Sequence, residues 1–171
     1  MNGIRSILIL TFFLPVIFVN SQSSSLPAID IYTLDGAMIK ASEISNDGNI
    51  MIVVFWKTYD RDGSNQVIML NEVHQERLLA KDVKFVAICV DCIGRTDHVK
   101  PIVYGQDIEM EVYIDKNGDL SRAMSIPRTP YTVMFDKQMN VHCKYAGYCA
   151  NGDEMLCRKI EACMEEIEAV R

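Results

Sequence analysis

Residues 53–63 read Val-Val-Phe-Trp-Lys-Thr-Tyr-Asp-Arg-Asp-Gly, and they carry the chain from an apolar run into a polar turn. The apolar run, residues 50–56, shows no alternation of polar and apolar side chains, which predicts a strand buried on both faces, as in the centre of a parallel sheet. A helix is predicted from Gly63 to about Ala80, because apolar residues recur there at three-residue steps (Val67, Leu70 and Val73). The stretch therefore indicates a strand, a turn and a helix.

The other segments extend this pattern into an α/β fold. Strands are predicted at residues 29–34, 37–40, 84–90, 111–114, 131–135 and 141–145, and helices at 96–103, 120–124 and 153–169. Pro101 predicts a kink in the first of these helices. The last helix has one apolar face, made by Leu156, Ile160, Cys163 and Ile167. Together the segments predict one α/β domain with a mixed central β-sheet flanked by helices.

The first 21 residues have the pattern of a secretory signal peptide. Arg5 supplies the positive start, residues 7–19 are almost entirely apolar, and tolerable cleavage residues follow. We expect a signal peptide at 1–21, a linker at 22–28 and the folded domain at 29–171. The alternative is an uncleaved membrane anchor, for which the apolar run is short. The expected location is a bacterial periplasm or the extracellular space, with no membrane contact after cleavage.

The charge balance narrows the range of partners. The chain has 171 residues and a formal net charge of −6, without clusters of basic residues. Such a chain has no electrostatic attraction for nucleic acid or for an anionic membrane. Its six cysteines would meet an oxidising environment after export, where disulfides form, and the sequence does not choose among the many possible pairings.

Three local matches resemble the exported thioredoxin-like proteins of the TlpA and redoxin type, over residues 27–170. They are the strand end Phe55-Trp56, the pair Thr129-Pro130 ahead of a strand, and Gly147-Tyr148 ahead of the last helix. The resemblance implies a thioredoxin-like fold, a cis peptide bond before Pro130, and an edge at which the backbone of Thr129 pairs with an extended substrate peptide. It implies that a peptide or protein client binds at this edge, on a surface made by Trp56, Tyr59, Thr129, Pro130, Gly147 and Tyr148.

The two catalytic positions of that family are changed in this chain. Where the family carries Trp-x-x-x-Cys-x-x-Cys, Asp60 and Gly63 stand in place of the cysteines. Neither residue can attack a disulfide, because the nucleophile in that reaction is a thiolate. The sequence therefore predicts a binding or redox-accessory module without dithiol catalysis at the usual site, and without a cofactor.

A displaced cysteine is the alternative source of activity. Cys92 follows the predicted strand 84–90, so it should lie near Asp60, since the carboxyl ends of neighbouring parallel strands meet at one edge of a sheet. Cys149 follows Gly147-Tyr148 and should lie at the same edge. The rival hypothesis is thus a thiol–disulfide oxidoreductase that uses Cys92 or Cys149. A third possibility is a structural protein whose cysteines are all in disulfides.

The remaining candidate ligands predict no metal site. Neither the segment from Asp60 nor the segment from Asp115 has the glycine that a calcium loop needs at its sixth position. His142 and the cysteines around it match no compact zinc-binding spacing. Three cysteines are predicted to be buried: Cys89 at the end of a strand, Cys163 on the apolar face of the last helix, and Cys143, which alternates with Val141 and Tyr145.

Overall fold

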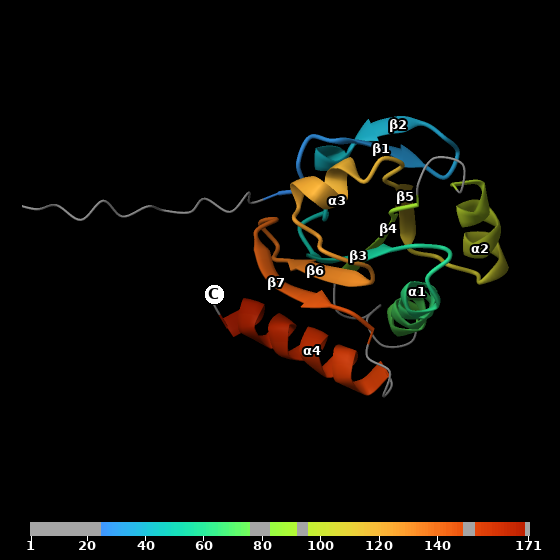
Figure 1. Ribbon diagram of the computed structural model, residues 1–171. Coiled ribbons are helices and arrows are strands. Elements are labelled where there is room, and N and C mark those ends of the chain that lie inside the picture. Colours follow the sequence, from blue (N-terminus) through green and yellow to red (C-terminus); the bar gives the residue numbers. More distant parts are fainter. Residues whose placement is uncertain (1–24, 76–82, 92–95, 149–152, 170–171) are drawn as a thin grey trace, which may run out of the picture.

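The computed structural model of the chain describes residues 25–75, 83–91, 96–148 and 153–169 (Figure 1). Its seven strands form one sheet in the order β2-β1-β5-β4-β3-β6-β7. The strands are β1 (Asp30–Thr33), β2 (Met38–Lys40), β3 (Ile50–Trp56), β4 (Val83–Cys89), β5 (Glu111–Ile114), β6 (Tyr131–Phe135) and β7 (Val141–Ala146). The helices are α1 (Arg61–Val73), α2 (Val99–Gly105), α3 (Asp119–Ala123) and α4 (Asp153–Ala169), with 3-10 turns η1 (Ala41–Glu43) and η3 (Thr96–His98). The predicted mixed α/β sheet is confirmed.

Strand β3 lies at the centre of the structure. It pairs in parallel with β4, from Ile50 opposite Val83 to Trp56 opposite Cys89, and antiparallel with β6 on its other side. All seven of its residues are buried. The unbroken apolar run of the sequence is thus explained, because helices or connecting segments cover both faces of this strand.

Two apolar cores lie on the two faces of the sheet. Ile52, Val54 and Trp56 face the core that α1, α2 and α4 close, whereas Val53 and Phe55 face a second core. Figure 1 shows α1 and α4 on one side of the sheet and α3 on the other. Burying each large aliphatic side chain contributes about 1.5–3 kcal/mol, so both faces contribute to stability.

The second core extends beyond the predicted domain boundary. Leu26 falls in the range 22–28 that the sequence assigns to a linker, yet its side chain is 1% exposed and packs with Ala41 of η1 and Leu120 of α3. The core therefore includes part of that range. Residues 1–24, which contain the predicted signal peptide, lie outside the described residues. No helix among the residues described is both long enough and apolar enough to cross a membrane.

Two helices begin differently from the predictions. Helix α1 begins at Arg61, two residues early, because the Asp60 carboxylate caps it by accepting a hydrogen bond from the Asp62 N–H at 3.2 Å. Helix α2 follows the 3-10 turn η3, and Pro101 lies in its first turn. Backbone N–H groups in a first turn have no partner within the helix, so Pro101 is tolerated at this position. The predicted extension of α1 to Ala80 falls partly on residues 76–82, outside the described residues.

A β-bulge in β7 changes which side chains share a face. Val141 lies opposite Phe135 and Cys143 lies opposite Met134, which leaves His142 as an extra residue. Val141 accordingly packs in the second core, whereas Cys143 and Tyr145 pack in the core under α4. Burial alternates along β7 as predicted, but Val141 and Cys143 face different cores, because a bulge re-aims the side chains that follow it. Cys143 is half-buried, and Cys89 and Cys163 are buried as predicted.

Asn71 provides a test of how α1 is joined to the segment between α2 and β5. Its buried amide donates a hydrogen bond to the Asp107 carbonyl at 3.0 Å and accepts one from the Glu109 N–H at 2.9 Å. Asn71→Ala would leave both backbone groups without this partner, and we expect it to lower the free energy of unfolding by roughly 2–4 kcal/mol in urea denaturation. The exposed neighbour Glu72 is the control, and Glu72→Ala should change little. A similar effect of the two substitutions would contradict this role.

Candidate functional site

The register of the sheet brings four chain segments to one edge. Trp56 lies opposite Cys89, and Phe55 lies opposite Tyr131, which in turn lies opposite Ala146. The residues just outside these pairs are therefore neighbours: the turn 57–60, residues 90–91, the loop 128–130 and residues 147–148. We call this set the β3 edge. It contains all the described residues that the sequence predicts to form a binding surface, apart from Trp56 at the end of β3 itself.

The Asp60 carboxylate is a point of contact between two of these segments. One of its oxygens caps α1 through the Asp62 N–H, and the other accepts a hydrogen bond from the Thr129 hydroxyl at 3.4 Å. The N-terminus of a helix carries partial positive charge and favours an anion at this position. Asp60 therefore links the start of α1 to the loop that precedes β6.

Gly63 lies one helical turn from Asp60 and is buried. A Cβ atom placed on Gly63 would be 3.5 Å from the nearer Asp60 carboxylate oxygen, 3.5 Å from Trp56 Cβ and 3.4 Å from the Lys57 nitrogen. These are ordinary van der Waals distances, so a Cβ atom can be accommodated at position 63. Side chains at positions 60 and 63 would face each other across the first turn of α1.

The buried carboxylate of Asp91 forms hydrogen bonds to the turn 57–60. Asp91, at the end of β4, is 0% exposed, and its Oδ1 accepts a hydrogen bond from the Thr58 N–H at 3.0 Å. Its Oδ2 accepts a second hydrogen bond from the Thr58 hydroxyl. The sequence analysis missed this residue, although its position gave a signal: a lone acidic residue directly after a buried strand, at the edge where the turn lies. Asp91 fixes the turn on which Tyr59 and Asp60 are carried.

The loop before β6 forms the other wall of the edge. The peptide bond between Thr129 and Pro130 is cis, the isomer that the resemblance implies. Pro130 is buried, and its carbonyl accepts a hydrogen bond from the Gly147 N–H at 2.8 Å. Gly147 has φ +88°, a conformation that favours glycine. Within the described residues, the backbone N–H and C=O of Thr129 make no hydrogen bond.

The exposed part of the edge is smaller than the sequence predicts. Tyr59 is 55% exposed, and Thr129 and Tyr148 are half-buried. Trp56 is 0% exposed, so it supports the turn from inside the core and does not lie on the surface. This corrects its predicted role as a contact residue, and the reason is that Trp56 is the last residue of a strand buried on both faces.

A hollow of about 320 Å³ adjoins the turn. It is lined by Thr58 and Tyr59 from the turn and by His98 and Ile102 from η3 and α2. The aromatic ring and the Ile102 side chain offer apolar surface, while the hydroxyl and imidazole offer polar groups.

Of the cysteines at or near this edge, only Cys89 lies within the described residues. Cys89 is 0% exposed, and burial together with the nearby Asp91 charge raises its pKa well above the usual range of a thiol. A protonated buried thiol is a poor nucleophile. Cys92 and Cys149, the displaced candidates, lie outside the described residues.

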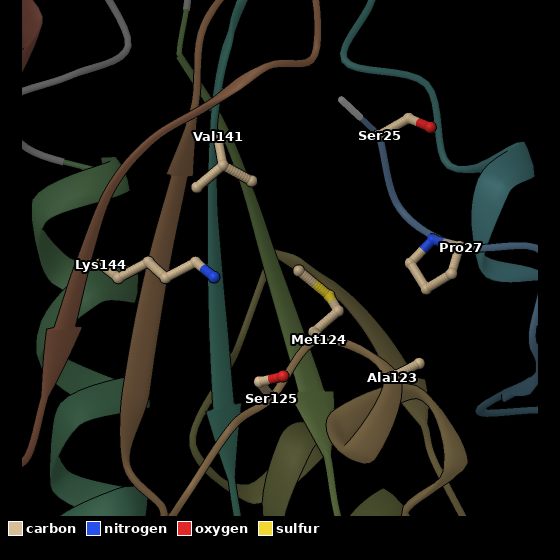
Figure 2. Close-up of a pocket in the computed structure, with 7 residues that line it drawn as sticks. All are labelled: Ser25, Pro27, Ala123, Met124, Ser125, Val141 and Lys144. Carbon is tan, nitrogen blue, oxygen red and sulfur yellow. The ribbon is translucent and has the colours of Figure 1, made fainter. Parts of the chain in front are cut away.

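A second hollow, of about 240 Å³, lies on the other side of the sheet (Figure 2). Val141 and Lys144 of β7 line one side, and Ser25 and Pro27 line the other. Residues 123–125 at the end of α3 close it below, and Figure 2 shows the Lys144 side chain extending toward them. None of the predicted site residues lines this hollow.

The sheet order, the cis bond before β6 and the turn that opens α1 define a thioredoxin-like protein. The sequence model of the AhpC/TSA family matches residues 23–144, and the chain belongs to that family. No match was found among curated proteins.

Solved structures show the same fold. The chain is 26% identical to an uncharacterized thioredoxin-like protein from Porphyromonas gingivalis, with a TM-score of 0.71 over 84% of this chain and 94% of that one. A protein assigned to the DsbE thiol:disulfide interchange proteins from Chlorobium tepidum is 19% identical, with a TM-score of 0.68 over 81% and 94%. A secreted disulfide oxidoreductase from Mycobacterium tuberculosis is 15% identical, with a TM-score of 0.63 over 79% and 96%.

The Asp91–Thr58 contact gives a testable prediction. Asp91→Ala removes the acceptor for two donors of Thr58, and we expect the free energy of unfolding to fall by about 2–4 kcal/mol, since hydrogen bonds to charged groups contribute more than neutral ones. Asp91→Asn keeps an oxygen for the Thr58 N–H and should cost less. Urea denaturation measures both variants. Equal stability of Asp91→Ala and the wild type would show that the carboxylate does not hold the turn.

Proposed function

We propose that this protein binds an extended peptide or protein segment at the β3 edge and lacks dithiol catalysis at the first turn of α1. In this proposal, Asp60 and Gly63 occupy the positions at which related thioredoxin-like proteins carry two cysteines. The contact surface is formed by Tyr59, Asp60, Thr129 and Tyr148, with Trp56 and Pro130 beneath it. No metal or cofactor is needed for this binding.

The observation that carries the proposal is the contact between Asp60 and Thr129. A carboxylate lies against the loop of the cis proline, at 3.4 Å from the Thr129 hydroxyl, where a nucleophilic sulfur would have to approach a substrate. Position 63 faces it across the turn and has no side chain. This contact supports the proposal of a dithiol site that has lost both thiols, because a carboxylate cannot replace a thiolate in disulfide exchange.

Open backbone groups support the binding part of the proposal. The N–H and C=O of Thr129 make no hydrogen bond among the residues described, so an extended peptide could pair with them as an added strand. Tyr59 and the adjoining hollow supply apolar surface beside that strand. Main-chain pairing would give affinity for many sequences, and the hollow would select among side chains.

Export forms part of the proposal. The pattern of residues 1–21 supports secretion, and the structural relative from Mycobacterium tuberculosis is itself a secreted protein. The proposed clients are accordingly proteins of a periplasm or of the extracellular space.

The rival function is a thiol–disulfide oxidoreductase that uses Cys92 or Cys149. One observation favours Cys92: the residue before it, Asp91, contacts the turn that carries Asp60. The two functions make opposite predictions for the isolated protein, because the oxidoreductase needs an accessible thiolate and the binding module does not.

Reduction of insulin by dithiothreitol separates the two functions. We expect the wild type to leave the reaction at its uncatalysed rate, and we expect the double variant Asp60→Cys, Gly63→Cys to accelerate it. The single variants are the controls, since one thiol cannot complete the dithiol cycle. Turnover by the wild type that is lost in Cys92→Ser or Cys149→Ser would establish the rival function.

Binding is tested with a set of unstructured peptides that contain no cysteine. Nuclear magnetic resonance should show the largest shifts at the amides of Tyr59, Thr129 and Tyr148. Tyr59→Ala should weaken binding about tenfold, equal to about 1.4 kcal/mol, as expected for an exposed aromatic anchor. Tyr104→Ala is the matched control, because Tyr104 is a comparably exposed tyrosine (63%) away from the β3 edge. Equal weakening by both variants would contradict the assigned surface.

A further inference from the structure

A cluster of metal-ligating groups lies at the bulge in β7. The bulge is near the start of that strand, whereas the β3 edge adjoins its other end. His142 is the extra residue of the bulge, and its Nε2 lies 3.3 Å from a carboxylate oxygen of Glu166 on α4. Cys163 lies one turn earlier on the same helix. One ring nitrogen of His142, the Cys163 sulfur and a Glu166 oxygen all lie within 4.8 Å of one another.

We infer that His142, Cys163 and Glu166 form a binding site for a zinc ion between β7 and α4. Imidazole, thiolate and carboxylate are the three side-chain groups that zinc takes in proteins, at distances of about 2.0–2.3 Å. Ligand atoms in a tetrahedral site are then roughly 3.3–3.7 Å apart. The His142–Glu166 distance of 3.3 Å already meets this requirement. The other pairs of ligand atoms lie within 4.8 Å, and rotation of the exposed Glu166 side chain can bring its oxygen closer to the Cys163 sulfur.

The surroundings of Cys163 suit a metal-bound thiolate. The Tyr145 hydroxyl lies 2.8 Å from the Cys163 sulfur, and a phenol O–H at this distance can donate a hydrogen bond to a thiolate. When zinc binds, the Cys163 thiol releases its proton to solvent and the sulfur takes the metal, with no change of oxidation state. Tyr145 then acts as a positioning residue that orients the ligand.

Two further features favour zinc over a harder cation. The Cys143 thiol packs beside Cys163 and lies 3.7 Å from the Met134 sulfur, so the inner side of the site is rich in sulfur. Calcium and magnesium prefer oxygen ligands alone. The chain is also acidic overall, which favours the approach of a cation.

The test titrates the full-length chain, purified without a histidine tag and kept reduced, with Zn²⁺ in competition with a chromogenic chelator. We expect one equivalent of zinc to bind. His142→Ala and Cys163→Ser should each weaken binding at least about tenfold, because even the outer partners of metal ligands account for 10–100-fold. Tyr145→Phe should weaken binding about tenfold. Glu166→Gln should also weaken zinc binding. Its matched control is Glu165→Gln, which removes the same charge from the adjacent residue. Glu165→Gln should leave the zinc affinity unchanged.

Cobalt supplies a readout that a merely structural role would not change. The Co²⁺-loaded wild type should show a sulfur-to-cobalt charge-transfer band, which Cys163→Ser abolishes and Glu165→Gln retains. His142 lies at the surface, so His142→Ala should stay folded even if Cys163→Ser does not. Zinc affinity unchanged in His142→Ala, absence of the charge-transfer band, or isolation of the chain with Cys163 in a disulfide would each overturn the inference.

Discussion

The pairing of β3 with a parallel neighbour on one side and an antiparallel neighbour on the other is the constraint on which the rest of the structure depends. Because both faces of β3 are buried, a shift of one residue would exchange every side chain between the two cores. The register is therefore fixed by packing. The same register places the ends of β3, β4, β6 and β7 in one row, so the packing of the core brings the segments of the candidate site together.

If the β3 edge has lost its nucleophile as proposed, the electrostatics at the start of α1 explain how its geometry can be kept. A thiolate at the N-terminus of a helix is stabilised by the N–H groups of the first turn. Asp60 uses the same groups, through the Asp62 N–H, and as a capping residue it contributes about 0.5–2 kcal/mol. In the proposed function, an acidic side chain thus retains the favourable interaction with the helix and gives up reactivity. At active sites, a substitution that raises stability often lowers activity.

Much of the fold could be predicted from local pattern alone. The run at 50–56 and the apolar face of the last helix gave β3 and α4 with their observed bounds, because burial on two faces and burial on one face leave different periodicities. The bulge at His142 could not be predicted, since it depends on how β7 pairs with β6 and leaves the local alternation unchanged. Asp91 was missed for a related reason: its partner Thr58 is 33 residues away in the sequence. Trp56 was assigned to the binding surface by the resemblance to thioredoxin-like proteins, whereas the apolar run 50–56 had itself predicted its burial.

Strand β7 connects the two proposed sites, and its position in the sheet suggests why they coexist. It is an edge strand, hydrogen-bonded only to β6 among the strands of the described sheet, and α4 packs along it through Tyr145 and Cys163. Edge strands need to be covered to avoid pairing with other chains. A zinc ion held by His142 of β7 and by Cys163 and Glu166 of α4 would fasten that cover at the start of the strand. Just beyond the other end of the strand, the Gly147 N–H donates a hydrogen bond to the Pro130 carbonyl at the β3 edge. Zinc binding would in this way keep β7 in the position that peptide binding at the β3 edge requires.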